Sequence, residues 1–290
     1  MRQLIVICSL VLLFASCNRD SLTPTPPTEV LKPVSYFDVS YGTQELQKMD
    51  IYLPGGRSAD STKTIVVIHG GAWIDGDKSE MTFVVDSIRR RSPKFAFINL
   101  NYRLAYNGAS NVFPSQELDV KAAIEYYLAK STEYAVSKDL IILGASAGAH
   151  LALLHSYKND PEKHVKAVVD FFGPTDLVAM WNEGALQLFD IIQLGLIIVT
   201  GKSYTDDPAI YTQSSPINFI TPQSPPTIAL QGELDDIVNP DQTTMLIDKL
   251  NSKGVSNQFV SYPNEGHGFS DAGNTDALNK IIPFLALHVK

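Results

Sequence analysis

The sequence has almost no cysteine, which limits the covalent means by which its fold is held together. Only Cys8 and Cys17 occur among the 290 residues, and both lie near the N-terminus. The rest of the chain therefore has neither a thiol nor a disulfide. We expect the domain to depend on its hydrophobic core, which a chain of this length is able to bury.

The sequence also lacks a basic stripe, a long run of one charge and any internal repeat. Its formal net charge is −8, with 23 Lys and Arg against 31 Asp and Glu. This acidic balance argues against a nucleic-acid-binding surface, which would need clustered Lys and Arg, so no nucleic-acid partner is expected. Hydrophobic residues make up 44% of the chain and charged residues 19%, which is the usual composition of a globular protein.

An apolar run of 12 residues, residues 4–15, stands near the start of the sequence. It is too short to span a bilayer as a mature helix, and it suits the core of a signal peptide. Residues 15–17, Ala-Ser-Cys, resemble the lipobox of bacterial lipoproteins, in which cleavage precedes a lipidated cysteine, although Phe14 stands where Leu is usual. We expect residues 1–17 to be a lipoprotein signal peptide and Cys17 to anchor the exported protein to a membrane of the cell envelope. The alternative is an ordinary secretory signal with an incidental cysteine.

The remaining chain divides into a tether, residues 18–33, and a domain, residues 34–290. Proline, threonine and charged residues predict that the tether is stiff and solvated. In the domain, the expected strands are 36–41, 48–53, 64–68, 95–100, 139–143, 165–172, 226–231 and 258–262. The expected helices are 115–130, 146–157, 242–251 and 276–288. This alternation predicts an α/β fold with a mostly parallel sheet, helices on both faces and a β-hairpin at one edge.

One long segment, residues 178–225, interrupts the alternation between two expected strands. It contains residues 186–199, Leu-Gln-Leu-Phe-Asp-Ile-Ile-Gln-Leu-Gly-Leu-Ile-Ile-Val, which are apolar nearly all round. We interpret the segment as a small helical cap inserted over a site. The alternative is a buried helix of the main core.

A Gly-x-Ser-x-Gly motif lies where the strand 139–143 meets the next helix, in residues 144–148. At such a strand-to-helix turn this motif forms a nucleophile elbow, which holds the serine outward at the carboxyl end of the sheet. The turn is tight enough to exclude side chains at its flanking positions, which accounts for Gly144 and Gly148. Ser146 is therefore the predicted nucleophile, and the alternative is that it only caps the helix.

Paired glycines follow the strand 64–68 in the sequence His-Gly-Gly-Ala-Trp, residues 69–73. Backbone N–H groups in such a loop stabilise the negative oxygen that acyl transfer creates. The predicted donors are the N–H groups of Gly71, Ala72 and Ala147. Trp73 is a candidate substrate-binding residue or a packing residue, and His69 is expected to pack beside the loop.

A serine hydroxyl needs a base, and the base needs a carboxylate that fixes its tautomer. Of the six histidines, His267 lies between glycines in a loop after the last expected strand, and we predict that it is the base. Asp235 follows the strand 226–231 and is the predicted acid, chosen over Asp236 and Glu233. Asp176 is a further candidate, expected more often to be a turn or capping residue.

The order Ser146, Asp235, His267 and the surrounding blocks resemble the α/β-hydrolase superfamily, within its esterase/lipase group with an HGG-type oxyanion loop. The blocks are MDIYLP, HGGAW, NYRLA, FPSQELDVKAAI, LGASAGAHLAL, SPPTIALQGELDDIV and NEGHGF, and they extend from Asp50 to Phe269. Such proteins include carboxylesterases, acetyl and feruloyl esterases acting on plant polysaccharides, and arylformamidases. Ala72 stands where many members have a third glycine, which a backbone donor tolerates.

The resemblance implies a serine esterase that works through an acyl-enzyme and needs no metal or cofactor. Its expected substrate is a small ester, with acetyl or feruloyl groups on carbohydrate as the finer hypothesis. One alternative is a peptidase or amidase on the same fold. The other is a binding protein that has lost its chemistry.

Overall fold

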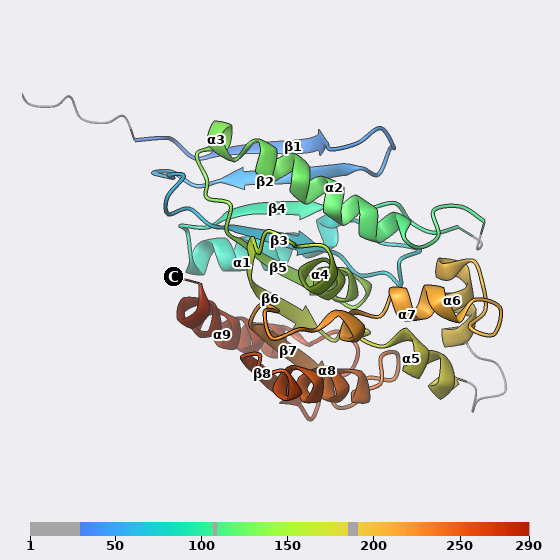
Figure 1. Cartoon of the computed structure of the whole chain (residues 1–290). Helices are drawn as coiled ribbons and strands as arrows, with labels where there is room; N and C mark the ends of the chain where they lie inside the picture. The colour runs from blue at the N-terminus through green and yellow to red at the C-terminus, as the bar shows by residue number, and fades with distance from the viewer. Residues whose placement is uncertain (1–29, 107–108, 185–190, 290) are drawn as a thin grey trace, which may run out of the picture. The chain divides into compact units, whose positions relative to one another are not determined.

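An eight-stranded sheet forms the centre of the computed structural model, which describes residues 30–106, 109–184 and 191–289 (Figure 1). Its order is β1-β2-β4-β3-β5-β6-β7-β8, with β1 and β2 antiparallel to their neighbours and the other strands parallel. The strands are β1 Val34–Ser40, β2 Lys48–Leu53, β3 Thr64–Ile68, β4 Ala96–Leu100, β5 Leu140–Ala145, β6 Val165–Phe171, β7 Thr227–Gly232 and β8 Asn257–Tyr262. The predicted α/β fold and edge hairpin are confirmed, whereas residues 1–29, including Cys17, lie outside the described residues.

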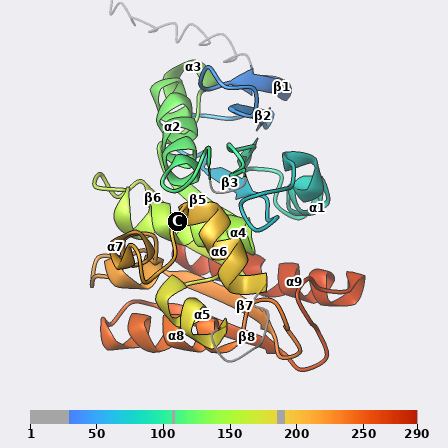
Figure 2. The same cartoon turned by 90° about the vertical axis from the view of Figure 1, so that its right-hand side faces the viewer.

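Helices cover both faces of this sheet, because its central strands are apolar along their whole length and need cover on each side. The helices are α1 Thr82–Arg91, α2 Ser115–Ala129, α3 Ser131–Tyr134, α4 Ala147–Lys158, α5 Leu177–Gly184, α6 Ile191–Thr200, α7 Pro208–Gln213, α8 Asp241–Ser252 and α9 Asp271–His288, with short 3-10 helices η1 Lys78–Met81 and η2 Pro216–Phe219. One hydrophobic core joins the sheet to α2, α4 and α8. The other joins it to α1 and α9, on the opposite side in Figure 2.

Besides the short α3, which was not expected, two longer helices differ from the sequence expectation. Helix α1 was not expected, because its apolar signal is small: only Val85, Ser87 and Ile88 are buried, and three arginines end it. Helix α9 begins earlier than expected, because the Ser270 hydroxyl accepts a hydrogen bond from the Gly273 N–H (3.1 Å) and caps its first turn. Both features depend on contacts that periodicity alone does not report.

The chain between β6 and β7 contains α5, α6, α7 and η2. Helix α6 covers the described part of the apolar segment that begins at residue 186. It buries Leu196 and Val199 but leaves Ile191 85% and Leu194 58% exposed, so its apolar surface is only half covered within the domain. In the described part of the chain, no helix combines the length and apolarity that crossing a bilayer requires.

A carboxyl group without a counter-charge is buried at the end of β6. Asp170 is fully buried, its Oδ1 accepts a hydrogen bond from the Gly173 N–H (2.8 Å), and its Oδ2 has no hydrogen-bond partner among the described residues. Burial raises the pKa of Asp170 to about 7, although the Gly173 N–H opposes this shift. The native state therefore favours the protonated form of this side chain.

We expect this carboxyl group to make folding stability fall as pH rises. Between about pH 4 and pH 7 the native state keeps a proton that the unfolded chain has lost, so the free energy of unfolding decreases by up to about 4 kcal/mol and is then constant. Asp170→Asn removes this dependence and keeps the acceptor for Gly173. Urea unfolding at pH 5 and pH 8 measures it, with exposed Asp60→Asn as the control. Equal pH dependence in wild type and Asp170→Asn would contradict the expectation.

Candidate active site

The turn from β5 into α4 holds Ser146 in a strained conformation. Its φ is 53° and its ψ −120°, a region that few non-glycine residues occupy. The turn packs directly on β3, because a Cβ added to Gly148 would lie 2.3 Å from the carbonyl oxygens of Ile68 and His69. The Ser146 side chain makes no capping hydrogen bond to α4. This placement excludes the helix-capping alternative and leaves the hydroxyl directed at other groups.

The structure brings Ser146, His267 and Asp235 into one chain of hydrogen bonds. His267 Nε2 lies 2.9 Å from Ser146 Oγ, and His267 Nδ1 lies 2.9 Å from Asp235 Oδ2. The three residues follow β5, β8 and β7, respectively, so each lies at the carboxyl edge of the parallel strands. A histidine placed between a hydroxyl and a carboxylate in this way can remove the hydroxyl proton.

Asp235 is held as a carboxylate by its surroundings. Its Oδ1 accepts the N–H groups of Ile237 (3.0 Å) and Val238 (2.9 Å), and its Oδ2 also accepts from Gln231 Nε2 (2.9 Å). Burial alone would raise the pKa of Asp235, but the hydrogen bonds from His267, Val238 and Ile237 and the nearby His267 charge outweigh it and lower the pKa. The ionised form therefore orients the Nδ1–H of His267.

The other acid candidates lie elsewhere. Asp176 begins α5, where its Oδ1 accepts the N–H groups of Val178 (2.9 Å) and Ala179 (3.1 Å). Asp236 and Glu233 are exposed, and Glu233 accepts a hydrogen bond from the Ser261 hydroxyl (2.7 Å). In this structure Asp176 is a capping residue, as the sequence suggested, and Asp235 is the carboxylate that contacts His267.

An aromatic side chain that the sequence analysis missed packs against His267. The Phe172 ring centroid lies 4.9 Å from that of His267 and 5.2 Å from that of Phe269. Phe172 has a φ of 44°, and its N–H donates to the Leu230 carbonyl (2.9 Å). The only feature of the sequence that could have indicated a role for Phe172 is its position directly after a buried strand. Its ring packs against the imidazole at a tilt of 60° and so limits where His267 can move.

The loop after β3 supplies candidate donors for an oxyanion. Gly71, Ala72 and Trp73 have successive φ values of 95°, 50° and 62°, and the Gly71 carbonyl accepts from the N–H of Ile74 (3.0 Å) and Asp75 (2.9 Å). Within residues 30–106, 109–184 and 191–289, the N–H groups of Gly71, Ala72 and the predicted third donor Ala147 have no protein acceptor. Unpaired N–H groups beside the Ser146 turn are what an oxyanion site requires.

The Trp73 side chain is buried, which favours the packing alternative, and its role in substrate binding stays a prediction. It is only 4% exposed, and its Nε1–H donates to Nδ1 of His150 (3.2 Å). Its ring also packs edge-on against Phe113, with centroids 5.6 Å apart. The indole is buried because it anchors the strained loop to the core, so the packing alternative describes it.

His150 connects this loop to the segment between β6 and β7. Its Nε2 lies 2.6 Å from the Ser214 carbonyl oxygen, while its Nδ1 faces the Trp73 N–H, which can only donate. Nδ1 must therefore accept and Nε2 must donate, which requires the neutral ring. Burial lowers the pKa of His150 to about 4, which agrees with this tautomer. The sequence showed only that His150 follows Ser146 on one helix.

We expect Trp73→Phe to loosen the oxyanion loop. A six-membered aromatic ring is kept, but the pyrrole ring and its N–H are lost, and leaving Nδ1 of His150 without a donor costs about 1–3 kcal/mol of stability. Turnover should fall about tenfold with little change in KM, because the loop donors act mainly in the transition state. Steady-state kinetics and urea unfolding measure both effects, with Trp181→Phe as the control. An unchanged kcat would show that the indole hydrogen bond does not position the donors.

The other histidine near the loop, His69, packs in the protein interior. It is fully buried, its ring stacks on Tyr102 with centroids 4.3 Å apart, and its Nδ1 lies 2.8 Å from the Gly70 carbonyl oxygen. Burial lowers its pKa.

Nowhere in the described ranges are three His, Cys, Asp or Glu side chains grouped so that they could hold a metal ion.

Comparison with known proteins shows the family to which the chain belongs. The model of the family described as BD-FAE matches residues 49–250, more than half of the chain. The chain is similar to the esterase LipC of Mycobacterium tuberculosis, with 26% identity over 80% of this chain and 59% of that protein, so it spans less than two thirds of this curated relative. It is also similar to two solved structures. The first is a bifunctional GH43-CE from Bacteroides eggerthii, with 28% identity and a TM-score of 0.75 over 88% of this chain and 38% of that one. The second is a truncated carbohydrate esterase from gut microbiota, with 26% identity and a TM-score of 0.74 over 90% of this chain and 98% of that one.

Proposed function

Because the chain belongs to the BD-FAE family, we propose that it is a serine hydrolase of carboxylic esters. The observation that carries this proposal is the hydrogen-bonded chain from Ser146 through His267 to Asp235, with 2.9 Å at each step. The similarity to a curated esterase and to carbohydrate esterase structures supports it.

In the proposed reaction, Ser146 Oγ attacks the ester carbonyl carbon while Nε2 of His267 takes its proton. The carbonyl oxygen becomes negative and accepts hydrogen bonds from the N–H groups of Gly71, Ala72 and Ala147. His267 then gives its proton to the leaving alcohol, and an acyl group remains on Ser146. Water attacks this acyl group with the same histidine as base, which releases the acid. Asp235 stabilises the imidazolium in both halves.

We further propose that the acyl group is carried by carbohydrate, as an acetyl or feruloyl ester. The support is the naming of two similar structures, one a carbohydrate esterase and one a bifunctional GH43-CE. The groups described at the site support the proposed chemistry at the carbonyl carbon. Which alcohol the ester can carry depends on the side chains that surround the carbonyl carbon. Assays with different ester substrates are therefore needed to test the carbohydrate assignment.

The test uses the chain from residue 18 and its Ser146→Ala variant. Both are assayed on p-nitrophenyl acetate, butyrate and octanoate, and on acetylated and feruloylated xylan fragments. We expect ester hydrolysis that the variant loses, with activity on the xylan esters as the finer result. Activity that persists in folded Ser146→Ala would refute the serine mechanism. Hydrolysis of simple esters alone would refute the carbohydrate assignment, and cleavage of peptide amides alone would favour an amidase.

The export of the protein as a lipoprotein is a second proposal, supported by the lipobox-like sequence at residues 15–17. Cys17→Ser removes the thiol that would carry the lipid. We expect the wild-type protein in the membrane fraction of a bacterial host and the variant in the soluble fraction. Labelling with a radioactive fatty acid gives an independent measurement. A variant that stays with the membrane would contradict the lipid anchor.

A further inference from the structure

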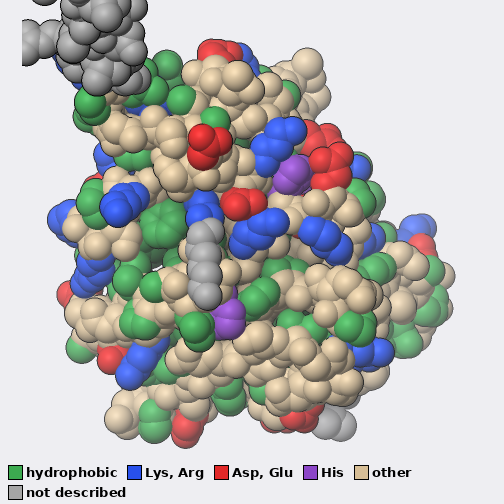
Figure 3. All heavy atoms as spheres, turned by 60° about the vertical axis from the view of Figure 1, so that its left-hand side comes forward, with side chains coloured by type: hydrophobic (Ala, Val, Ile, Leu, Met, Phe, Trp, Pro, Cys, Tyr) green, Lys and Arg blue, Asp and Glu red, His purple; other side chains and the backbone are tan. Residues whose placement is uncertain are grey.

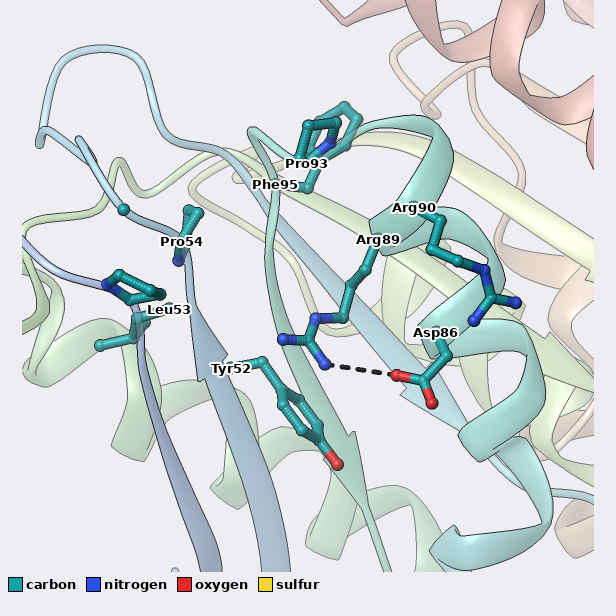
Figure 4. A pocket seen from close by; sticks show the side chains of 10 residues that line it. Tyr52, Leu53, Pro54, Asp86, Arg89, Arg90, Pro93 and Phe95 are labelled. Carbon is teal, nitrogen blue, oxygen red and sulfur yellow. Dashed lines mark hydrogen bonds and ion pairs between the residues drawn. The ribbon is translucent and has the colours of Figure 1, made fainter.

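Two adjoining hollows open at the amino ends of β3 and β4, away from the triad. The first, about 490 Å³, has Tyr52, Arg89 and Arg90 in its wall (Figure 4). The second, about 370 Å³, is lined by Lys63, Arg91 and Lys94, among others. Pro93 and Phe95 belong to both. We call the five cationic residues of these hollows the basal patch: Lys63, Arg89, Arg90, Arg91 and Lys94.

The basal patch has an excess of positive charge although the chain as a whole is acidic. Asp86 is the one carboxylate that lines the two hollows, and it pairs with Arg89 (3.3 Å). Arg90 and Arg91 bond instead to the hydroxyl and the carbonyl of Ser87. In the described part of the chain, no carboxylate lies within ion-pair distance of the other four cations. Figure 3, with the left-hand side of Figure 1 brought forward, shows several Lys and Arg side chains on this face, with some Asp and Glu side chains among them.

The position of these cations is only partly explained by the helix on which three of them lie. Arginines in the last turn of α1 are favourable there, because the carboxyl end of a helix dipole is negative. Lys63 and Lys94, however, precede β3 and β4 and lie on no helix. The patch therefore adds Lys63, from a distant part of the chain, to the four cations of residues 89–94, an arrangement that folding alone does not favour.

The chain enters the domain beside this patch. The Leu31 carbonyl accepts a hydrogen bond from the Gly56 N–H (2.8 Å), and the Lys32 carbonyl accepts from Arg57 Nη1 (2.6 Å). Pro33 lines the first hollow together with Arg89 and Arg90. Fourteen residue steps separate Cys17 from Leu31, a contour length of at most about 50 Å. An acyl group on Cys17 would therefore hold the point where the chain enters the domain, which lies beside the basal patch, within about 50 Å of a bilayer.

Exposed apolar side chains lie beside the cations. Leu31 is 40% and Phe37 66% exposed, and the Phe37 ring packs edge-on against Tyr52 of the first hollow, with centroids 5.8 Å apart. A soluble polyanion needs only charge, whereas the interface of an anionic bilayer takes both cations and exposed aromatic or aliphatic groups. The combination favours a lipid surface.

We propose that the basal patch docks the domain on a bilayer that contains anionic phospholipid. Lys63 and Lys94 stand at the amino ends of parallel strands, whereas Ser146 follows the carboxyl end of β5. Docking through the basal patch thus turns the triad away from the bilayer, toward ester substrates that are not part of it. Proximity to the bilayer rests on the proposed lipid anchor, but the binding of the patch to lipid does not.

The experiment uses the chain from residue 18 without lipid, sedimented with vesicles of phosphatidylcholine alone or with 30% phosphatidylglycerol. The test variant is Arg90→Glu/Lys94→Glu. The control, Lys48→Glu/Lys202→Glu, changes the net charge equally at residues outside the two hollows. Hydrolysis of p-nitrophenyl acetate is measured on all three proteins, so that loss of binding is distinguished from loss of folding or of the proposed activity.

We expect binding to the anionic vesicles only, weakened by salt. The test variant should bind at least about twentyfold more weakly than wild type. Each basic side chain at an anionic surface raises the affinity about fivefold, and the variant loses two of them. The control should change less than threefold, and all three proteins should hydrolyse the ester equally. Absence of wild-type binding, or an equal loss in the control, would overturn the proposal. Tighter patch-dependent binding to polygalacturonate than to vesicles would replace the bilayer with a soluble polyanion.

Discussion

His267→Ala lowers kcat/KM for p-nitrophenyl acetate by at least about a thousandfold while the protein stays folded. The size follows from what the imidazole does: without it, Ser146 Oγ has no base 2.9 Å away, and the leaving alcohol has no proton donor. Losses of this order are usual when one member of such a triad is removed. The residual rate comes from the oxyanion donors and from substrate binding.

Steady-state kinetics with wild type and His267→Ala give the comparison, and circular dichroism confirms folding. His164→Ala is the matched control, because His164 is paired only with Glu162 on the surface (2.9 Å). Its activity should stay within about twofold of wild type, since surface substitutions rarely disturb a distant site. A loss of less than tenfold in His267→Ala would show that another group activates Ser146.

Asp235→Asn is expected to reduce kcat by about ten-thousandfold, while Asp176→Asn leaves it almost unchanged. An amide at position 235 can offer its NH2 group to Nδ1 of His267 and so favour the wrong tautomer, in which Nε2 carries the proton and cannot accept one from Ser146. Asp176 instead accepts backbone N–H groups at the start of α5, and asparagine caps a helix about equally well.

The kcat values of the two asparagine variants on one ester decide between the two acids. Both substitutions keep the side-chain shape and remove one negative charge, so each is the control for the other. The opposite pattern, with a large loss in Asp176→Asn and a small one in Asp235→Asn, would transfer the acid role to the residue after β6. Equal large losses would indicate damage to the fold, which urea unfolding would detect.

Local patterns sufficed for most of the fold and for the proposed triad. A short run of apolar residues bounded by turns specifies a buried strand by itself, and the expected strands agree with the observed ones to within about two residues at most ends. Ser146 and His267 were identifiable for a similar reason, since the glycines that a tight turn requires are sequence neighbours. Asp235 was chosen among nearby acids, and its contact with His267 required the three-dimensional structure.

Contacts between distant segments were not predictable in this way. The hydrogen bond from Trp73 to His150 and the tilted ring contact between Phe172 and His267 join residues that are far apart in the chain. Helix α1 was missed because only a narrow strip of its surface is buried. Whether an indole lines a cleft or fills the core depends on what folds over it, and the sequence around Trp73 is compatible with both.

The sequence by itself determined the class of the fold, the elbow that presents Ser146 and the order of the groups proposed to act with it, because these depend on periodicity and on local turn chemistry. It showed no basic stripe. Arg90 and Lys94 are near neighbours in the sequence, but only the tertiary structure brings Lys63 beside them, because the amino ends of adjacent parallel strands and the end of α1 meet there. Surface charge is a property of neighbours in space, whereas strand and turn signals are properties of neighbours in the chain.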